Sequence, residues 1–210
     1  MSRAQLTQER SRARREALLA AAIELFAEGG SRSVTHRAVA ARAGLPPATT
    51  TYYFASIEEL VREALQSHIS GWIATLESLA SIEIDPRVDV TTASSLVTEI
   101  FATRSPEKAG TELAIYLAAA RDPELRDSAA AALQALQDLT VSVLGRAGLD
   151  APEDLAAQVV ALIAGVALRR QSGQYDEPVE ARLITVGVRN LVAAHLLGET
   201  AVDEALVRPV

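Results

Sequence analysis

The stretch GLPPATTTYY at residues 44–53 decides how the N-terminal part of the chain folds. Each proline disfavours helical geometry at the residue before it, and Pro47 suits the first position of a new helix. The sequence therefore predicts a turn at residues 44–47 and a short helix after it. On that helix only Ala48 is aliphatic, and the other side chains carry hydroxyls or aromatic rings. Such a helix is poor core material but suits phosphates and base edges.

A second short helix is predicted directly before this turn. Thr35 can cap its N-terminus, the helix runs over residues 36–43, and Gly44 marks its end. Two short helices joined by a glycine-containing turn are typical of the helix-turn-helix, whose second helix enters the major groove of DNA. A longer helix at residues 12–28 precedes the pair, so we expect a three-helix DNA-binding domain. Apolar side chains mark its buried face: Leu18, Ala22, Leu25 and Phe26.

A long helix is predicted to follow the helix-turn-helix. Ser56 and Glu59 form a capping box, which opens a helix that reaches about residue 80. Every fourth side chain along it shares one face: Leu60, Ala64, His68, Trp72 and Leu76. We expect a DNA-binding domain at residues 1–55 and a helical ligand-binding and dimerisation domain at residues 56–210, with this helix linking the two.

Two further helices are predicted at residues 106–121 and 123–144. The expected inward side chains are Leu113, Tyr116, Leu117 and Ala120 on the first, and Leu133, Leu136, Leu139, Thr140 and Val143 on the second. Helix bundles place ligands between facing helices, so these two and the long helix could enclose a pocket. The candidate lining residues are His68, Trp72, Phe101, Tyr116 and Gln137. The alternative is that these side chains are ordinary core.

The last two predicted helices, residues 152–170 and 178–197, are the candidates for a dimer interface. Their apolar faces are broad, and two glycines would let helix backbones approach closely. Two copies of the pair would make a four-helix bundle around a two-fold axis. The expected interface residues are Leu162, Gly165, Val166, Leu183, Val186, Gly187, Leu191 and Ala194. An intramolecular core is the alternative.

Charge divides the chain into two regions. The whole chain of 210 residues has a formal net charge of −7, which by itself would argue against a nucleic-acid partner. Residues 1–55, however, hold 8 Arg against 4 Glu, and the remaining residues hold 12 basic against 23 acidic side chains. The positive charge is therefore concentrated around the predicted helix-turn-helix.

Composition removes several function classes. The chain has no cysteine, so it has no disulfide, thiolate nucleophile or thiol redox sensor. No apolar run approaches the roughly 20 residues of a membrane span, and the polar residues 1–15 are unlike a signal peptide. We expect a soluble, cytoplasmic protein that needs no metal or other cofactor and has no membrane partner.

An enzyme is the main rival interpretation, because all-α bundles can host catalysis. The three histidines, His36, His68 and His195, are widely separated in sequence. Zinc-protease, di-iron, phosphate-loop and nucleophile-elbow motifs are all missing from the sequence. We therefore predict no catalytic residues and no enzymatic activity.

Residues 21–65 resemble the DNA-binding domain of the TetR family of bacterial transcriptional regulators. The motifs that carry the resemblance are EGG at 28–30, VTHRAVA at 34–40, AGL at 43–45, TTTYYF at 49–54, and Ser56 with Glu59 and Leu60. Their combined spacing is far more specific than a lone helix-turn-helix pattern. Beyond this segment the chain is similar to the family only in being helical and of the expected length.

The resemblance implies a role for eight residues. The residues implied to face bases are Arg37, Pro47, Ala48, Thr49 and Tyr52, and those implied to lie near phosphates are His36, Thr51 and Tyr53. It also implies that Thr50 packs inward. The family dimerises through its C-terminal helices, and a two-fold dimer suits a palindromic DNA site.

The sequence departs from the family pattern at two positions. Thr51 stands where many members have Tyr, and Ile57 stands where many have Lys at the start of the fourth helix. A phosphate contact that is common in the family is therefore expected to be missing. The N-terminal arginines could compensate on phosphates or in the minor groove, or could be only a solvated helix start. These arginines are Arg10, Arg12, Arg14 and Arg15.

Together these observations predict a ligand-responsive, homodimeric repressor. It would bind palindromic double-stranded operator DNA and be released by a small, hydrophobic effector. A ligand against the long helix would change the spacing of two recognition helices, which must lie about 34–36 Å apart to read successive major grooves. A DNA-binding activator or a ligand-independent regulator is the alternative that the sequence leaves open.

Overall fold

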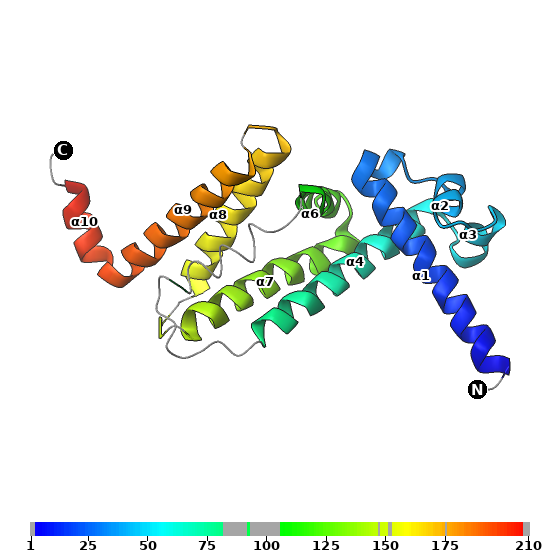
Figure 1. Cartoon of the computed structure of the whole chain (residues 1–210), viewed down its shortest axis with the longest axis horizontal. Helices are drawn as coiled ribbons and strands as arrows, with labels where there is room; N and C mark the ends of the chain where they lie inside the picture. The colour runs from blue at the N-terminus through cyan, green and yellow to red at the C-terminus, as the bar shows by residue number, and fades with distance from the viewer. Residues whose placement is uncertain are drawn as a thin grey trace. The chain divides into compact units, whose positions relative to one another are not determined.

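The protein is described by a computed structural model that covers residues 3–81, 92, 106–146, 148–150, 153–174 and 176–207. Its elements are shown in Figure 1, and within these ranges they are helices without any strand. In chain order they are α1 (Arg3–Gly29), the 3₁₀ turn η1 (Gly30–Arg32), α2 (His36–Arg42), α3 (Ala48–Tyr53), α4 (Ile57–Ala80), α6 (Pro106–Ala119), α7 (Pro123–Arg146), α8 (Glu153–Gln171), α9 (Glu177–Leu197) and α10 (Glu199–Val207). The predicted all-α fold is confirmed.

The chain forms two compact units. The first comprises residues 1–72 and 111–130, and the second comprises residues 73–110 and 131–210. The first unit therefore contains α1, α2, α3 and most of α4, together with parts of α6 and α7. The second unit contains α8, α9 and α10 with the remaining parts of α4, α6 and α7.

The core of the first unit is built around the predicted apolar face of α1. Leu18, Ala22, Leu25 and Phe26 are all buried, as the spacing predicted. Helices α2 and α4 and the residue after α3 contribute other large buried side chains to this unit: Val39, Phe54, Leu60 and Leu65. Burial of one apolar stripe per helix is what stabilises short helices such as α2 and α3, which are too short to be stable alone.

The predicted inward face of α6 is wrong. Leu117 is 58% exposed and Ala120 is also exposed, whereas Thr111, Ile115 and Ala119 are buried. The helix is apolar on most of its circumference, so its periodicity did not define one face. On α7 the predicted Leu136, Leu139, Thr140 and Val143 are buried, but Leu133 is 36% exposed because the buried stripe passes through Ala132 instead.

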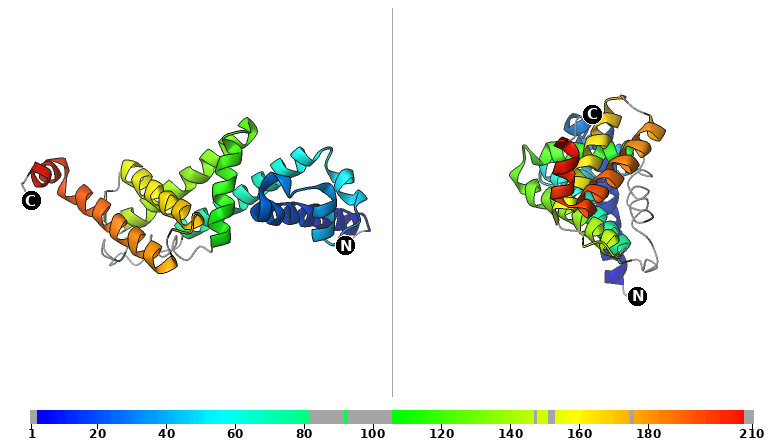
Figure 2. Two further views of the ribbon diagram at one scale, coloured as in Figure 1. Left: turned by 90° about the horizontal axis from the view of Figure 1, so that it is seen from above. Right: turned by 90° about the vertical axis from the view of Figure 1, so that its left-hand side faces the viewer.

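Helices α8 and α9 form the centre of the second unit. They run side by side in Figures 1 and 2, and six apolar residues of α8 and three of α9 are buried. Helix α9 also carries Gly187, where an added Cβ would lie 2.5 Å from Cδ2 of Leu162. The two helices therefore approach closely at this glycine within one chain.

Helix α10 is not among the helices predicted from the sequence. It follows Gly198, whose φ of 78° turns the chain out of α9, and it packs against α9 without burying any residue of its own. Ala201 and Val202 are half-buried, whereas the later apolar side chains are exposed, with Leu206 at 77% and Val207 at 83%. A helix that buries nothing gives no apolar stripe to recognise, which is why the pattern missed it.

Candidate nucleic-acid interface

The turn between α2 and α3 depends on Gly44. Its φ is +66°, in the left-handed region that side chains disfavour. The Gly44 N–H donates to the carbonyl of Ala41 at 3.2 Å, and the Leu45 N–H donates to the carbonyl of Ala40 at 2.9 Å. These two bonds form a Schellman motif, which satisfies the last carbonyls of α2 and reverses the chain. The turn predicted from Gly44 and the prolines is therefore present and hydrogen bonded.

Two of the predicted site residues lie at the start of α2. The Thr35 side chain caps this helix by accepting a 3.1 Å hydrogen bond from the Ala38 N–H, as expected. His36 and Arg37 follow in the first turn; Arg37 is exposed and His36 is half-buried. The Nδ1 atom of His36 is buried and has no hydrogen-bond partner among the described residues.

The other six predicted residues lie on α3 or just before it. Pro47, Ala48, Thr51 and Tyr52 are exposed, with Tyr52 at 80%, and Thr49 and Tyr53 are half-buried. A ring this exposed contributes nothing to the core, so Tyr52 is available to a partner. Thr50 is fully buried and its hydroxyl donates to the Pro47 carbonyl at 3.1 Å, which confirms that it packs inward.

The two tyrosines of α3 are held against each other and against α1. Their rings meet edge to face, with centroids 4.9 Å apart. The Tyr53 hydroxyl is hydrogen bonded to the Ser11 hydroxyl at 2.9 Å, across 42 residues of sequence. Because Tyr53 is fixed at both its ring and its hydroxyl, it positions the exposed ring of Tyr52.

A groove of about 570 Å³ lies between the N-terminal half of α1 and α3. Arginine guanidiniums and hydroxyl groups dominate its lining: Thr7, Arg10, Ser11, Arg14, Ala48, Thr49, Tyr52 and Tyr53. Four of these residues are among those predicted to contact DNA. Donors of this kind and positive charge are what a phosphodiester backbone requires.

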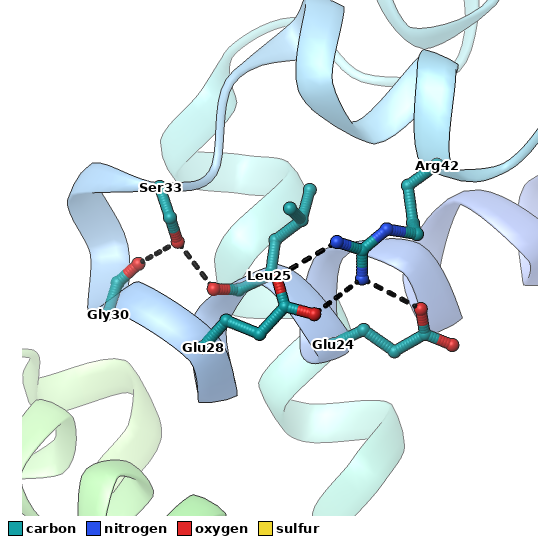
Figure 3. A network of polar contacts seen from close by, with 6 residues as sticks. All are labelled: Glu24, Leu25, Glu28, Gly30, Ser33 and Arg42. Carbon is teal, nitrogen blue, oxygen red and sulfur yellow. Dashed lines mark hydrogen bonds and ion pairs between the residues drawn. The ribbon is translucent and has the colours of Figure 1, made fainter.

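Arg42 ties α2 to α1 (Figure 3). Its guanidinium donates to both carboxylate oxygens of Glu28, at 2.9 and 2.8 Å, and to Glu24 at 3.1 Å. The hydrogen bond from Arg42 lowers the pKa of the Glu28 carboxyl, and the two carboxylates raise the pKa of Arg42. This contact was not predicted from the sequence. Two glutamates four residues apart on α1 were the available signal, but their partner comes from another helix.

The start of α4 is capped much as predicted. The Glu59 N–H donates to the Ser56 hydroxyl at 3.1 Å, and the Glu59 carboxylate accepts from the Ala55 N–H at 2.6 Å. In the usual capping box this second bond would come from the N-cap residue itself, so here it is displaced by one residue. The result is the same, because the backbone N–H groups of Ala55 and Glu59 are both satisfied.

Three of the five predicted pocket residues lie in the first unit. His68, Trp72 and Tyr116 are each half-buried, and the Trp72 and Tyr116 rings meet at 65° with centroids 6.4 Å apart. Burial lowers the pKa of the His68 imidazole, which favours its neutral form. Gln137 is half-buried in the second unit, and Phe101 lies outside the described residues.

The start of α7 is joined to α4 within the first unit. Arg62 of α4 contacts Asp122 at 3.2 Å and Glu124 at 3.1 Å, and both carboxylates raise the pKa of the Arg62 guanidinium. The Gln66 side-chain amide also donates to the Glu124 carbonyl at 3.4 Å. The segment that follows α6 is thus connected to the helix that directly follows α3.

The eight residues predicted for the dimer interface differ in their exposure to solvent. Gly165, Val186 and Ala194 are exposed, while Leu183 and Leu191 are half-buried. Val166 is only 6% exposed, and Leu162 packs against Gly187 within the same chain. Only part of the predicted set is therefore presented to a partner by a single chain.

Two family models match the chain. The model described as "Bacterial regulatory proteins, tetR family" matches residues 18–64, and "Tetracyclin repressor-like, C-terminal domain" matches residues 88–207, more than half of the chain. Among curated proteins, the chain is 28% identical over 188 residues to the HTH-type transcriptional regulator BetI of Rhizobium meliloti (strain 1021), covering 87% of this chain and 89% of that protein.

Solved structures give the same result. A TetR-family member from Streptomyces coelicolor A3 is 27% identical with a TM-score of 0.59, covering 83% of this chain and 97% of that one. The multidrug binding protein EbrR complexed with proflavin is 26% identical with a TM-score of 0.56, covering 83% of this chain and 99% of that one. Among the described residues, no helix has the length and apolar character that a membrane crossing requires.

Proposed function

Because the chain belongs to the TetR family of bacterial transcriptional regulators, we propose that it is a homodimeric repressor that leaves a palindromic operator when a small hydrophobic effector binds. The observation that carries the DNA-binding part is the exposed face of α3. Tyr52 is 80% exposed, and Tyr53 is fixed behind it by the Ser11 hydroxyl. A rigid, solvated aromatic and hydroxyl surface after a glycine turn is suited to base edges in a major groove.

We assign base contacts to Arg37, Pro47, Ala48, Thr49 and Tyr52, and phosphate contacts to His36, Thr51 and Tyr53. The exposure of five of these residues supports the assignment. Thr51 donates its hydroxyl proton to the Ala48 carbonyl at 3.1 Å, so its oxygen can still accept a hydrogen bond but its proton is already used. Its contact with phosphate would therefore be through a water or its methyl group.

The dimer would form through the exposed surface of α8 and α9. Gly165, Val186 and Ala194 are the predicted residues that a partner could reach, and the neighbouring Leu168 is 54% exposed. A two-fold pairing of this surface would give a four-helix bundle. It would also place two copies of α3 on a two-fold symmetric DNA site.

The effector would contact Trp72 and Tyr116. Their half-buried rings meet edge to face, and His68, one turn before Trp72, is kept neutral by burial. EbrR binds proflavin and ethidium, two planar aromatic molecules, which supports an aromatic effector here. Such a ligand would displace Tyr116 and, through Asp122, Glu124 and Arg62, move α4 and the adjoining α3.

DNA binding is tested with fragments that flank the protein's own gene, by fluorescence anisotropy of the full-length protein. We expect tight binding of wild type, and each of Tyr52→Ala and Thr49→Ala to weaken it about 10- to 100-fold, because a base contact contributes about 1–3 kcal/mol. The matched control is Thr200→Ala, an exposed threonine on α10, away from the proposed DNA-binding and dimer surfaces. Wild-type binding that is weak and indifferent to sequence would contradict the assignment.

Effector binding is tested by intrinsic fluorescence, because Trp72 is the only tryptophan of the chain. Titration with ethidium or proflavin is expected to quench Trp72 emission saturably and to release the operator fragment. Tyr116→Ala is expected to weaken both effects together. If the quenching is linear in ligand concentration, or if Tyr116→Ala titrates as wild type does, the effector does not bind at this pair of rings.

A further inference from the structure

The arginines at positions 10, 12, 14 and 15 of α1 form two groups of two that differ in their contacts. Arg12 forms an ion pair with Glu16 at 3.0 Å, one turn along the same helix. Arg15 forms an ion pair with Glu63 of α4, and its guanidinium lies 5.2 Å from the centre of the Phe54 ring. Both guanidiniums are therefore already paired with a carboxylate of the same chain, and Arg15 helps to hold α1 against α4.

Arg10 and Arg14 differ from them in both contacts and position. Neither has an ion pair among the described residues, and both are exposed. They lie four residues apart, hence on one face of α1, and both line the groove whose opposite wall is α3. Ser11, between them, is the residue whose hydroxyl bonds Tyr53 at 2.9 Å.

The chemistry of the groove is that of an anion site. Its two charged lining residues are arginines, and the opposite wall carries the Thr49 side chain and the Tyr52 ring. A guanidinium binds a phosphate through two parallel hydrogen bonds, more strongly than a neutral donor does. The site lies beside the exposed face of α3, so a duplex contacted by α3 would bring its backbone to this edge.

The arginine wall of the groove lies in a part of the chain that the family's DNA-binding model does not cover. The model matches residues 18–64, whereas α1 begins at Arg3. Residues 3–17 contain five arginines against two glutamates, so the added turns of helix are basic. The sequence also leaves room for further phosphate contacts, because Ile57 offers no positive charge at the start of α4.

We propose that Arg10 and Arg14 bind the phosphodiester backbone of operator DNA and clamp it beside α3. This inference rests on the proposed DNA-binding function and adds two phosphate contacts per protomer to it. The Ser11–Tyr53 hydrogen bond is the positioning contact, because it fixes the distance between the arginine face of α1 and the recognition helix. The contacts carry no sequence information and act through charge.

The test compares the full-length double variant R10Q/R14Q with wild type and with R12Q, using anisotropy on one operator fragment across a salt series. R12Q is the matched control, because it removes an exposed arginine that is already paired with Glu16. We expect R10Q/R14Q to lower the magnitude of the salt slope by about 0.9 for each contact removed, hence by about 3.6 for a dimer. R12Q is expected to keep the wild-type slope.

The double variant is also expected to bind about tenfold or more weakly near physiological salt, equally on operator and on scrambled DNA. Its melting temperature should match that of wild type, since both side chains are exposed. A salt slope unchanged from wild type, with operator binding intact, overturns the clamp and leaves the proposed function standing. Failure of wild type itself to bind any fragment overturns the proposed function, and the clamp with it.

Discussion

Phe54→Ala is expected to lower the free energy of unfolding by about 3–5 kcal/mol, which is typical of truncating a fully buried phenylalanine. Phe54 is 2% exposed, stands directly after α3, and its N–H donates to the Thr50 carbonyl at 3.0 Å. The Arg15 guanidinium covers its ring at 5.2 Å. The cavity would therefore open where α1, α3 and α4 meet. Urea denaturation at fixed protein concentration measures the change.

Two variants make this prediction specific. Phe54→Leu keeps most of the buried volume and is expected to cost less than about 1.5 kcal/mol. Tyr52→Ala, two residues earlier, removes an 80% exposed ring and is expected to change stability by no more than about 0.5 kcal/mol while weakening DNA binding. If Phe54→Ala unfolds at the wild-type urea concentration, Phe54 is not the anchor of α3.

Glu180→Ala is expected to destabilise the second unit by about 3 kcal/mol, because it removes the carboxylate that pairs with the largely buried Arg170 guanidinium. Glu180 is 5% exposed and accepts from Arg170 Nε at 2.9 Å, while Glu177, 3.8 Å from Arg170, remains as a weaker, exposed partner. Because Glu177 remains near Arg170, the expected loss of stability lies at the lower end of the range of about 3–5 kcal/mol for broken buried ion pairs. Urea denaturation at pH 7 measures it.

The apolar double variant Arg170→Met/Glu180→Leu is the control for this pair. It removes both buried charges, so it is expected to be as stable as wild type or more stable. A double variant as unstable as Glu180→Ala would show that packing, and not the unpaired charge, sets the cost.

The pH dependence gives an independent check on Glu180. Burial raises the pKa of this carboxyl above its usual 4.5, despite the opposing effect of Arg170, and the Glu180 Oε1 atom has no hydrogen-bond partner among the described residues. A folded-state pKa above the unfolded one means that the folded protein binds the proton more tightly. The contribution of Glu180 to stability is therefore greatest below pH 4.5 and is lost as pH rises through the folded-state pKa. The stability of wild type relative to the double variant should fall across that interval.

The local features of the fold could be predicted from the sequence. Gly44 and Pro47 restrict backbone geometry by themselves, and Thr35 and Ser56 cap helices through residues three positions away. These signals depend on neighbours in sequence, so the helix-turn-helix and the start of α4 follow from them. Thr50 packs inward as the family resemblance implied, on the side of α3 opposite the solvent.

Features that depend on distant partners could not be predicted in this way. The Arg42 contacts with Glu24 and Glu28, and the Ser11 contact with Tyr53, join different helices. The inward face of α6 was assigned wrongly because a helix that is apolar on most sides offers no clear stripe. On α8 and α9 the apolar pattern did not tell which side faces the chain's own core, and Gly187 turned out to accommodate Leu162 of the same chain.

The central claim is that the α2–α3 surface reads a two-fold symmetric DNA sequence. In vitro selection of duplexes from a random library by the full-length protein tests this claim without requiring the operator sequence to be known. We expect wild type to enrich one palindrome whose half-site centres lie about 34–36 Å apart, and the Thr49→Ala/Tyr52→Ala double variant to enrich none. Recovery of no common sequence by wild type, or of the same sequence by the double variant, would contradict it.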